Sequence, residues 1–316
     1  MFQHEGNHIG DAWYFVENDI CHCYYLTCPV TVTRHTAWDI AHATSSDLIH
    51  WNLHGTVIHR GDPGQWDHDC LATGSVAAYG GCYWMAYTGP WCGSLTQIGL
   101  AYSFDLYHWE KYPHNPVIKP DESLFSQHGR GIRKFCHWRD AKLYVHNDRL
   151  YALICATSRH APEDACGSVA VVSTDDLQNW SVEGEIEIEA ICQELECPQI
   201  QKVDNLYVLL FSCFKDLFSL SMQNKYGRQL RQTSYYLISH QPKGPYQFVP
   251  DFTLLPNDPQ KPEESLQYAN QLVLFQGKWY LLGTIWSDFG DCISDPYLIH
   301  MSEDRLTAEP ISGESF

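Results

Sequence analysis

A short motif recurs along the chain and constrains its fold more than any other feature of the sequence. Ser45-Ser-Asp-Leu-Ile-His-Trp51 matches Ser103-Phe-Asp-Leu-Tyr-His-Trp109, and both resemble the segment Ser173-Thr-Asp-Asp-Leu-Gln-Asn-Trp180. A chance similarity between hairpins is a poor explanation for three copies in register. The copies are separated by roughly 60–70 residues, a period that accommodates about four short strands and their turns.

Strand-like segments flank each copy of the motif. Short apolar runs precede the three copies at 40–44, 98–102 and 168–172, and another follows the first copy at Asn52–Ile58. Ser and Asp side chains can hydrogen-bond the backbone of a tight turn, and the Leu and Trp side chains can pack beneath it. The motif therefore predicts a turn between the third and fourth strands of a four-stranded unit.

Such units predict an all-β fold, a five-bladed β-propeller. Counting them gives blades at about 8–58, 67–118, 134–182, 191–248 and 267–301. We expect the polar stretch 215–233 to form an elaborated hairpin in the fourth blade, and 296–301 to be the last strand of the fifth. Because no linker stands out, we expect residues 1–316 to form a single domain, although the length alone favours about two.

Charge and hydropathy exclude several classes of partner. The formal net charge is −18 and the pI is near 5.2, whereas a nucleic-acid binder needs a basic stripe that neutralises phosphates. The same charge disfavours an anionic membrane surface. No apolar run approaches the roughly 18 residues of a membrane span. We therefore expect no nucleic acid and no membrane as partners, and a ligand that is neutral or cationic.

The cysteines and histidines predict neither a disulfide framework nor a metal site. The 13 cysteines are odd in number and include no Cys-x-x-Cys pair, which favours reduced thiols acting as small buried hydrophobic groups. Reduced thiols, and an N-terminus without a basic and apolar leader, favour a cytoplasmic location. Among 17 histidines, no helical His-x-x-x-His pair or Cys/His ligand spacing supports zinc. We expect no metal and no cofactor.

Three acidic residues, Asp11, Asp140 and Glu196, occupy equivalent places in different blades. Each lies near the start of its blade, in a strand-like stretch that is followed by a polar turn and an aromatic-rich run. The first strand of each propeller blade lines the central channel, so we expect the three carboxylates to meet on the axis. A single acidic residue early in a strand is more often a turn former or an edge charge. The recurrence across blades carries the prediction.

Converging carboxylates suit the hydrolysis of a glycosidic bond. One carboxylate acts as nucleophile or general base, and a second, protonated carboxyl gives its proton to the leaving oxygen. Arg139 directly precedes Asp140 and is expected to hold that carboxyl ionised, which would make Asp140 a poor acid. Core packing is the commoner role of any one Trp, but four are candidate platforms for a sugar ring: Trp13, Trp38, Trp66 and Trp138.

Taken in order, these residues resemble glycoside hydrolase family 32 and its relatives, the β-fructofuranosidase-like propellers. Asn7-His-Ile-Gly-Asp11 takes the place of the family's Asn-Asp-Pro motif. Trp138-Arg-Asp-Ala141 is similar to its Arg-Asp-Pro motif, and Glu196-Cys-Pro198 to its Glu-Cys motif. Further matches follow in the same order at 38–45, 73–75, 87–89 and 268–271. Each motif is short, but the ordered set covers almost the whole chain.

The resemblance implies a role for each acid. Asp11 would be the nucleophile, Asp140 the stabiliser of the transition state, and Glu196 the general acid/base, with retention of configuration through a glycosyl-enzyme intermediate. Arg139 would orient Asp140 and contact the sugar. The residues expected to contact substrate are Trp13, Trp38, His42, Trp66, Thr73, Ser75, Arg139, Tyr268 and Gln271.

The sequence also departs from the family pattern. Gly10 stands in place of the motif's Asn, and Ala12 and Ala141 stand in place of its Pro residues, so the fructose pocket is expected to differ. Members of the family usually carry a C-terminal β-sandwich. We expect none within residues 1–316, because the fifth blade takes up the end of the sequence.

Several interpretations stay open at this point. The leading one is a retaining glycosidase acting on a terminal fructofuranoside or a similar small furanoside. Propellers of family 43 use a similar trio with inversion, so an arabinofuranosidase or xylosidase is the alternative within the same class. A carbohydrate-binding propeller without catalysis is the alternative of another class. The expected partner is a small neutral sugar or oligosaccharide, and self-association into a homo-oligomer is open.

Overall fold

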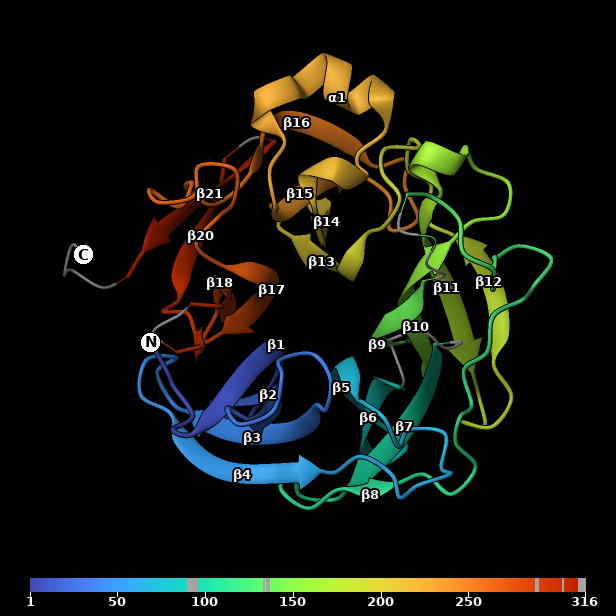
Figure 1. Ribbon diagram of the computed structural model, residues 1–316, viewed down its shortest axis with the longest axis vertical. Helices are drawn as coiled ribbons and strands as arrows, with labels where there is room; N and C mark the ends of the chain where they lie inside the picture. Colours follow the sequence, from blue (N-terminus) through green and yellow to red (C-terminus); the bar gives the residue numbers. More distant parts are fainter. Residues whose placement is uncertain (90–95, 133, 135–136, 288–289, 303, 312–316) are drawn as a thin grey trace.

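The computed structural model describes residues 1–316 except 90–95, 133, 135–136, 288–289, 303 and 312–316. Five antiparallel sheets surround a central axis (Figure 1), which confirms the predicted all-β, five-bladed propeller. Each sheet is one blade made from a continuous part of the chain. Its first strand lies next to the axis, and the following strands pair in order toward the outside.

The strands fall close to the predicted blades. Blade one holds β1 (Asn7–Glu17), β2 (Ile20–Pro29), β3 (Asp39–Ser45) and β4 (Asn52–Ile58). Blade two holds β5 (Ala72–Tyr79), β6 (Cys82–Gly89), β7 (Gln97–Ser103) and β8 (Glu110–Lys111). Blade three holds β9 (Trp138–His146), β10 (Arg149–Thr157), β11 (Gly167–Thr174) and β12 (Ser181–Glu185), with the short helical turn η1 (Glu163–Ala165) before β11.

The last two blades add helical turns in blade four and a further strand in blade five. Blade four holds β13 (Glu196–Val203), β14 (Leu206–Cys213), β15 (Thr233–Ser239) and β16 (Gln247–Thr253). The expected elaborated hairpin joins β14 to β15, and its elaboration is helical, with η2 (Lys215–Leu217), α1 (Leu220–Tyr226) and η3 (Gly227–Gln229). Blade five holds β17 (Tyr268–Phe275), β18 (Lys278–Ile285), β19 (Cys292–Ile293) and β20 (Tyr297–Ser302). A further strand, β21 (Arg305–Pro310), is its outermost element, so 296–301 is not the last strand.

The recurring motif forms the predicted turn between the third and fourth strands. In blade one, Ser45 Oγ accepts a hydrogen bond from Leu48 N at 2.8 Å, and Asp47 Oδ1 accepts from the backbone N–H groups of Ile49 and His50. Blade two repeats these bonds. In blade three it is Thr174, not Ser173, that takes the place of the serine. The side chains of the motif therefore satisfy the turn backbone as expected.

Every innermost strand is interrupted near its start. The regular pairing with the second strand slips between Ile9 and Ala12, Ala72 and Gly74, Arg139 and Lys142, Glu196 and Gln199, and Tyr268 and Gln271. Three residues inside these slips, Asp140, Cys197 and Ala269, have positive φ angles of 57°, 50° and 50°. A β-bulge bends its strand and redirects a side chain. Asp11, Thr73 and Asp140 lie within these slips, and Glu196 and Tyr268 directly precede them.

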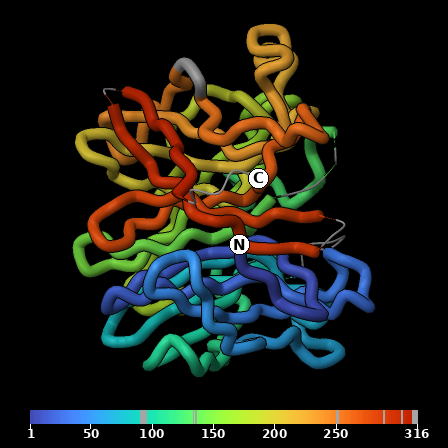
Figure 2. The backbone as a smooth tube through the Cα atoms, turned by 90° about the vertical axis from the view of Figure 1, so that its left-hand side faces the viewer, coloured from blue at the N-terminus to red at the C-terminus, as the bar shows by residue number. Residues whose placement is uncertain are grey.

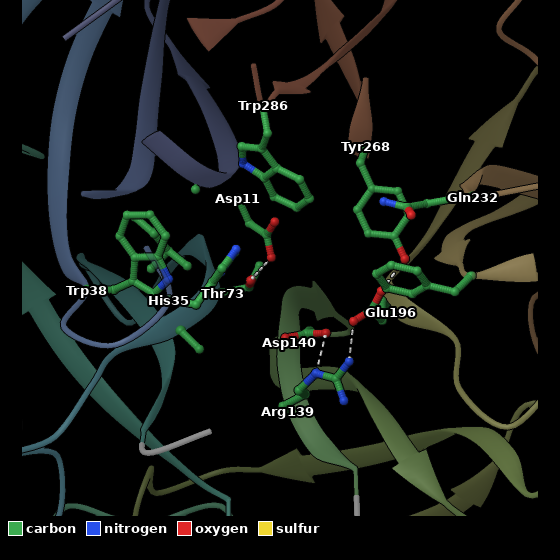
Figure 3. Close-up of a pocket in the computed structure, with 14 residues that line it drawn as sticks. Asp11, His35, Trp38, Thr73, Arg139, Asp140, Glu196, Gln232, Tyr268 and Trp286 are labelled. Atoms are coloured by element: carbon green, nitrogen blue, oxygen red, sulfur yellow. Dashed lines mark hydrogen bonds and ion pairs between the residues drawn. The ribbon is translucent and has the colours of Figure 1, made fainter. Parts of the chain in front are cut away.

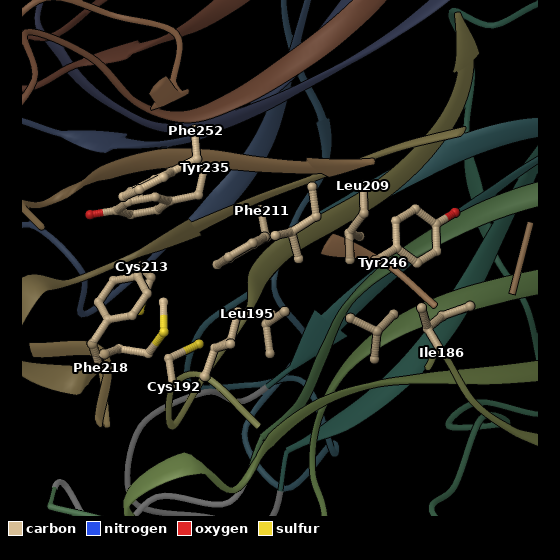
Figure 4. Close-up of a cluster of buried hydrophobic side chains, with 14 of the residues drawn as sticks. Ile186, Cys192, Leu195, Leu209, Phe211, Cys213, Phe218, Tyr235, Tyr246 and Phe252 are labelled. Carbon is tan, nitrogen blue, oxygen red and sulfur yellow. The ribbon is translucent and has the colours of Figure 1, made fainter. Parts of the chain in front are cut away.

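Hydrophobic clusters fill the spaces between neighbouring blades. Figure 4 shows the cluster between blades three and four, in which Leu209, Phe211 and Tyr235 are buried. Burying a side chain of this size stabilises the fold by about 1.5–3 kcal/mol. The cysteines in the described part of the chain are free thiols and nearly all are buried, as predicted. No helix that the structure describes is long and apolar enough to cross a membrane.

The ring closes where blade five meets blade one. Phe2 pairs with Ile293, and Figure 2 shows the N-terminal segment beside the red C-terminal strands. Asp291 is buried at this junction. Its Oδ1 accepts a hydrogen bond from Arg34 at 2.8 Å, and its Oδ2 lies 2.9 Å from His8 Nδ1. Blade five is therefore tied to blade one by charged groups as well as by apolar packing.

Candidate active site

The bulged strands surround a cavity of about 330 Å³ on the propeller axis (Figure 3). All five blades contribute to its wall. Asp11, Asp140 and Glu196 all line it, as the strand positions predict, and Figure 3 shows Asp11 across the cavity from Glu196. Its volume is at the lower end of the range of small-molecule sites, about 300–1,000 Å³. The other lining residues are Gly10, Leu26, His35, Trp38, Ala72, Thr73, Arg139, Phe214, Gln232, Tyr268 and Trp286.

Asp11 is a carboxyl group with few donors around it. Thr73 Oγ1 donates a hydrogen bond to its Oδ2 at 2.5 Å, and Cys197 Sγ lies 3.8 Å from the same oxygen. Burial, with smaller contributions from the nearby Asp140 and Glu196, raises the pKa of Asp11 to about 7, and the hydrogen bond from Thr73 and the charge of Arg139 oppose this change. The carboxyl group therefore changes its charge close to neutral pH.

Gly10, one of the departures from the family motif, is required by packing. A Cβ atom at this position would lie 2.8 Å from Leu26 Cβ and 3.3 Å from the Trp38 ring. Both of these side chains line the cavity. Glycine thus lets the strand that carries Asp11 approach the cavity wall closely.

Asp140 is more completely enclosed than Asp11. Its Oδ2 accepts a hydrogen bond from Cys197 N at 3.1 Å and lies 3.3 Å from Arg139 Nε. Burial nevertheless raises the pKa of Asp140 to about 6, because Arg139 offsets only part of the desolvation. The direction of this shift is opposite to the one expected from Arg139 alone, but a pKa of about 6 still leaves the carboxyl mainly ionised at neutral pH.

Glu196 accepts hydrogen bonds at both oxygens. Arg139 Nη2 donates to Oε1 and the Tyr268 hydroxyl donates to Oε2. Arg139 also contacts Glu194, whose Oε2 lies 3.5 Å from Nη2 and 3.2 Å from His137 Nε2. Burial alone lowers the pKa of Arg139, but these acidic neighbours raise it above its ordinary value, so the guanidinium stays charged. It is the positive centre of an acidic site.

Four of the predicted substrate contacts lie in the cavity wall: Trp38, Thr73, Arg139 and Tyr268. Trp13 and His42 do not line the cavity, and the structure contradicts their assignment as substrate contacts. Both are completely buried. Trp13 packs against Tyr24 between blades one and two, and His42 stacks on Tyr24 at 4.5 Å. Strand alternation directs these side chains into the core instead of toward the axis.

Three more predicted contacts have structural partners outside the cavity wall. Ser75 donates to Ala141 O at 2.6 Å and accepts from Leu143 N at 2.7 Å, which joins blade two to blade three. Gln271 Oε1 accepts a hydrogen bond from Lys142 at 3.2 Å. Trp66 is half-buried against Tyr87, with ring centroids 5.6 Å apart. The remaining candidate platform is buried as well: Trp138 donates to Ile118 O at 3.1 Å.

Sequence reasoning missed several residues of the site. Phe214 and Trp286 directly follow the second strands of blades four and five. A second strand runs antiparallel to the first, so its end lies beside the bulge that carries the catalytic candidates. An aromatic residue directly after the second strand of a blade could therefore have been predicted to lie in the cavity wall. Glu194 lies two residues before β13 begins at Glu196, and its contact with Arg139 brings a second carboxyl group to the guanidinium.

A resident metal has no evident place here. Within the described residues, no group of three or more His, Cys, Asp or Glu side chains is arranged to hold a metal ion. The cationic group next to the carboxylates is Arg139. The groups that the cavity wall offers for chemistry include carboxyl groups, a guanidinium and hydroxyl groups.

Known proteins resemble this chain over its whole length or in part. The curated relatives include the extracellular exo-inulinase of Meyerozyma guilliermondii, 28% identical over 207 residues that cover 60% of this chain and 36% of that protein. The raffinose invertase of Escherichia coli is 28% identical over 181 residues, 54% of this chain and 34% of that protein. The match therefore spans only about a third of the length of these relatives.

Solved structures share the fold at lower identity. An inulosucrase from Halalkalicoccus jeotgali, solved bound to kestose, has a TM-score of 0.78 at 16% identity and covers 100% of this chain and 92% of its own. A sucrose-6-phosphate hydrolase from Lactobacillus gasseri has a TM-score of 0.74 at 20% identity and covers 98% of this chain and 63% of its own. The model of the N-terminal domain of glycosyl hydrolases family 32 matches residues 7–285, and the chain belongs to this family.

Proposed function

We propose that the protein is a glycosidase that removes a terminal fructofuranosyl unit from a small sugar or oligosaccharide. The observation that carries the proposal is the convergence of Asp11, Asp140 and Glu196 in one cavity, each with different hydrogen-bond partners. Carboxyl groups in different surroundings can take different roles in one reaction. The names of the relatives, an exo-inulinase and an invertase, support a fructose-containing substrate.

In the first step, Asp11 acts as the nucleophile. An ionised Asp11 oxygen forms a bond to the anomeric carbon of the fructosyl unit, and the bond from that carbon to the leaving oxygen breaks. Glu196, protonated at this stage, gives its proton to the leaving oxygen, which departs as an alcohol. Thr73 holds Asp11 in place through its hydrogen bond. The products of this step are the leaving alcohol and a covalent glycosyl-enzyme.

In the second step, Glu196 acts as the general base. It removes a proton from a water molecule, whose oxygen forms a bond to the anomeric carbon. The bond to Asp11 breaks, and its electron pair returns to the carboxylate. Two displacements at the same carbon give retention of configuration.

Arg139 and Asp140 support both steps without moving a proton. Positive charge develops at the anomeric carbon in each transition state, and an ionised Asp140 in the cavity wall stabilises it. Arg139 contacts Asp140, Glu194 and Glu196. When Glu196 takes up a proton, the guanidinium keeps its contacts with the other two carboxylates. Arg139 thus lets Glu196 alternate between its acid and base forms.

The test combines two substitutions with a screen of substrates. Asp11→Asn and Glu196→Gln are each expected to lower kcat on sucrose or a fructo-oligosaccharide by at least about 10²–10⁴-fold, with unchanged circular dichroism. Glu309→Gln, which alters an exposed carboxyl on blade five, is the matched control and should keep full turnover. NMR of the first product anomer should show retention.

Other outcomes would assign the site differently. Inversion, together with turnover of aryl arabinofuranosides or xylosides, would favour the family 43-like alternative. Binding of fructo-oligosaccharides by the unsubstituted protein without any turnover would identify a carbohydrate-binding propeller. Near-normal turnover by either carboxyl variant would contradict the catalytic roles proposed here.

A further inference from the structure

A second hollow adjoins the catalytic cavity. It has a volume of about 590 Å³, and Phe214 and Gln232 line both spaces. Its other walls come from the helical β14–β15 connection, which contributes Gln223 and Arg228, and from the segment that carries Glu263. We call this hollow the blade-four groove. The groove is formed by the helical insertion of blade four, which stands between β14 and β15 where a short turn could connect the two strands.

The boundary between the two spaces is held firmly. Gln232 N donates to Glu263 O at 2.8 Å, and Ser265 N donates to Gln232 O at 2.9 Å. Lys215 Nζ, in the helical insertion, lies 2.9 Å from Glu263 Oε1. Backbone pairing therefore fixes Gln232 at the junction, with its side chain in the wall of both spaces.

The groove opens on the side of the cavity where the leaving group must lie. The Phe214 ring packs against Tyr268, with centroids 5.2 Å apart, and the Tyr268 hydroxyl donates to Glu196. Figure 3 shows Gln232, Tyr268 and Glu196 together on one side of the cavity, with Trp38 and His35 on the other. Since Glu196 is the proposed donor to the leaving oxygen, the remainder of the substrate extends past Glu196 toward Phe214 and Gln232.

The charges of the groove select among possible leaving groups. Its lining contains two cationic residues, Lys215 and Arg228, and three acidic ones, Asp216, Glu263 and Glu264. Lys215 is paired with Glu263. Lys261, just outside the lining, lies 3.7 Å from Glu264, so the positive and negative charges nearly cancel and a phosphorylated sugar would gain no net electrostatic attraction. Amide, guanidinium and carboxylate groups along an open groove suit the hydroxyl groups of a neutral sugar chain.

We infer that the blade-four groove binds the leaving part of a neutral oligosaccharide, so that the preferred substrate has at least three sugar units. The inference rests on the proposed function, because it takes the position of the leaving group from the role of Glu196. Contacts made in the groove are remote from the bond that breaks, and they lower the barrier measured by kcat/KM. A disaccharide, whose leaving group is a single sugar, forgoes most of them.

The experiment compares kcat/KM for kestose, a trisaccharide, with kcat/KM for sucrose. The ratio is expected to be about tenfold, the gain from one or two well-placed hydrogen bonds. Arg228→Ala removes an exposed groove cation and should lower the ratio about fivefold. Lys225→Ala removes an exposed cation from the same helical insertion without touching the groove lining. It should leave the ratio unchanged.

Three results would overturn the groove assignment: a ratio near one, an equal effect of the two substitutions, or a preference for sucrose 6-phosphate over kestose. If neither sugar is hydrolysed, the proposed function fails. A binding measurement then tests separately whether the groove is a sugar site. In that case calorimetric titration of the Asp11→Asn variant should give tighter binding of kestose than of sucrose. Equal affinities would reject the groove as a sugar site.

Discussion

At the scale of single residues, the cavity holds buried acidic groups, and burial favours their neutral, protonated forms over their charged forms. Burial raises the pKa of Asp11 to about 7 and that of Asp140 to about 6. An acid whose pKa is raised by folding binds more protons in the folded protein than in the unfolded chain. Its contribution to stability is therefore fully present below the pKa that it has in the unfolded chain, near 4. This contribution is lost as the pH rises through the higher pKa that it has in the folded protein.

The upward shift of the Asp11 pKa gives a prediction for Asp11→Asn that does not depend on any substrate. The neutral amide can still accept the hydrogen bond from Thr73 but carries no buried charge at high pH. We expect the variant to be more stable than the unsubstituted protein at pH 8 by about 1–2 kcal/mol. The difference should shrink as the pH is lowered from 7 toward 4, where Asp11 is protonated. Urea unfolding at pH 4.5 and pH 8 measures it, and equal differences at both pH values would contradict the raised pKa.

At the scale of elements, the sequence predicts what side chains impose locally and misses what depends on pairing. The Ser-x-Asp-Leu turns could be read directly, since Ser45 and Asp47 bond the backbone within a few residues. The bulges could not, because a slip in pairing is a property of two strands. Asp is among the non-glycine residues that adopt a positive φ more often, but Cys197 and Ala269 are not such residue types, so their bulges leave no signal in the sequence. The lining of the cavity was accordingly predicted only in part.

The turn motif supplies a prediction with an internal control in blade three. Asp176 Oδ1 accepts hydrogen bonds from Asn179 N at 2.7 Å and Gln178 N at 3.0 Å, which lower its pKa to about 2. The side chain of its neighbour Asp175 forms an exposed ion pair with Arg149. Asp176→Ala should lower the melting temperature by about 2–4 °C at pH 7, whereas Asp175→Ala should change it little. Equal shifts for the two variants would show that the turn bonds are unimportant.

At the scale of the whole molecule, a propeller of consecutive blades must join its last blade to its first. The sequence predicted five blades but gave no information about the junction, because the groups involved are far apart in the chain. Phe2 pairs with Ile293, and Asp291 lies between His8 and Arg34. The junction also supports the site: Trp286 of blade five donates to Ile9 O, and Thr284 donates to Gly10 O, next to Asp11. Ring closure and the position of the proposed nucleophile are thus coupled.

Asp291→Ala tests this coupling. The substitution leaves Arg34 and His8 without their buried acceptor and should lower the free energy of unfolding by about 2–3 kcal/mol. Glu309→Ala, which breaks the exposed pair with His300 at 3.1 Å, should change it by less than about 1 kcal/mol. If closure positions Asp11, then Asp291→Ala should also lower kcat on the best substrate at a temperature where the variant is still folded. A stable variant with full kcat would mean that apolar packing alone closes the ring, whereas lost stability with full kcat would separate closure from the site.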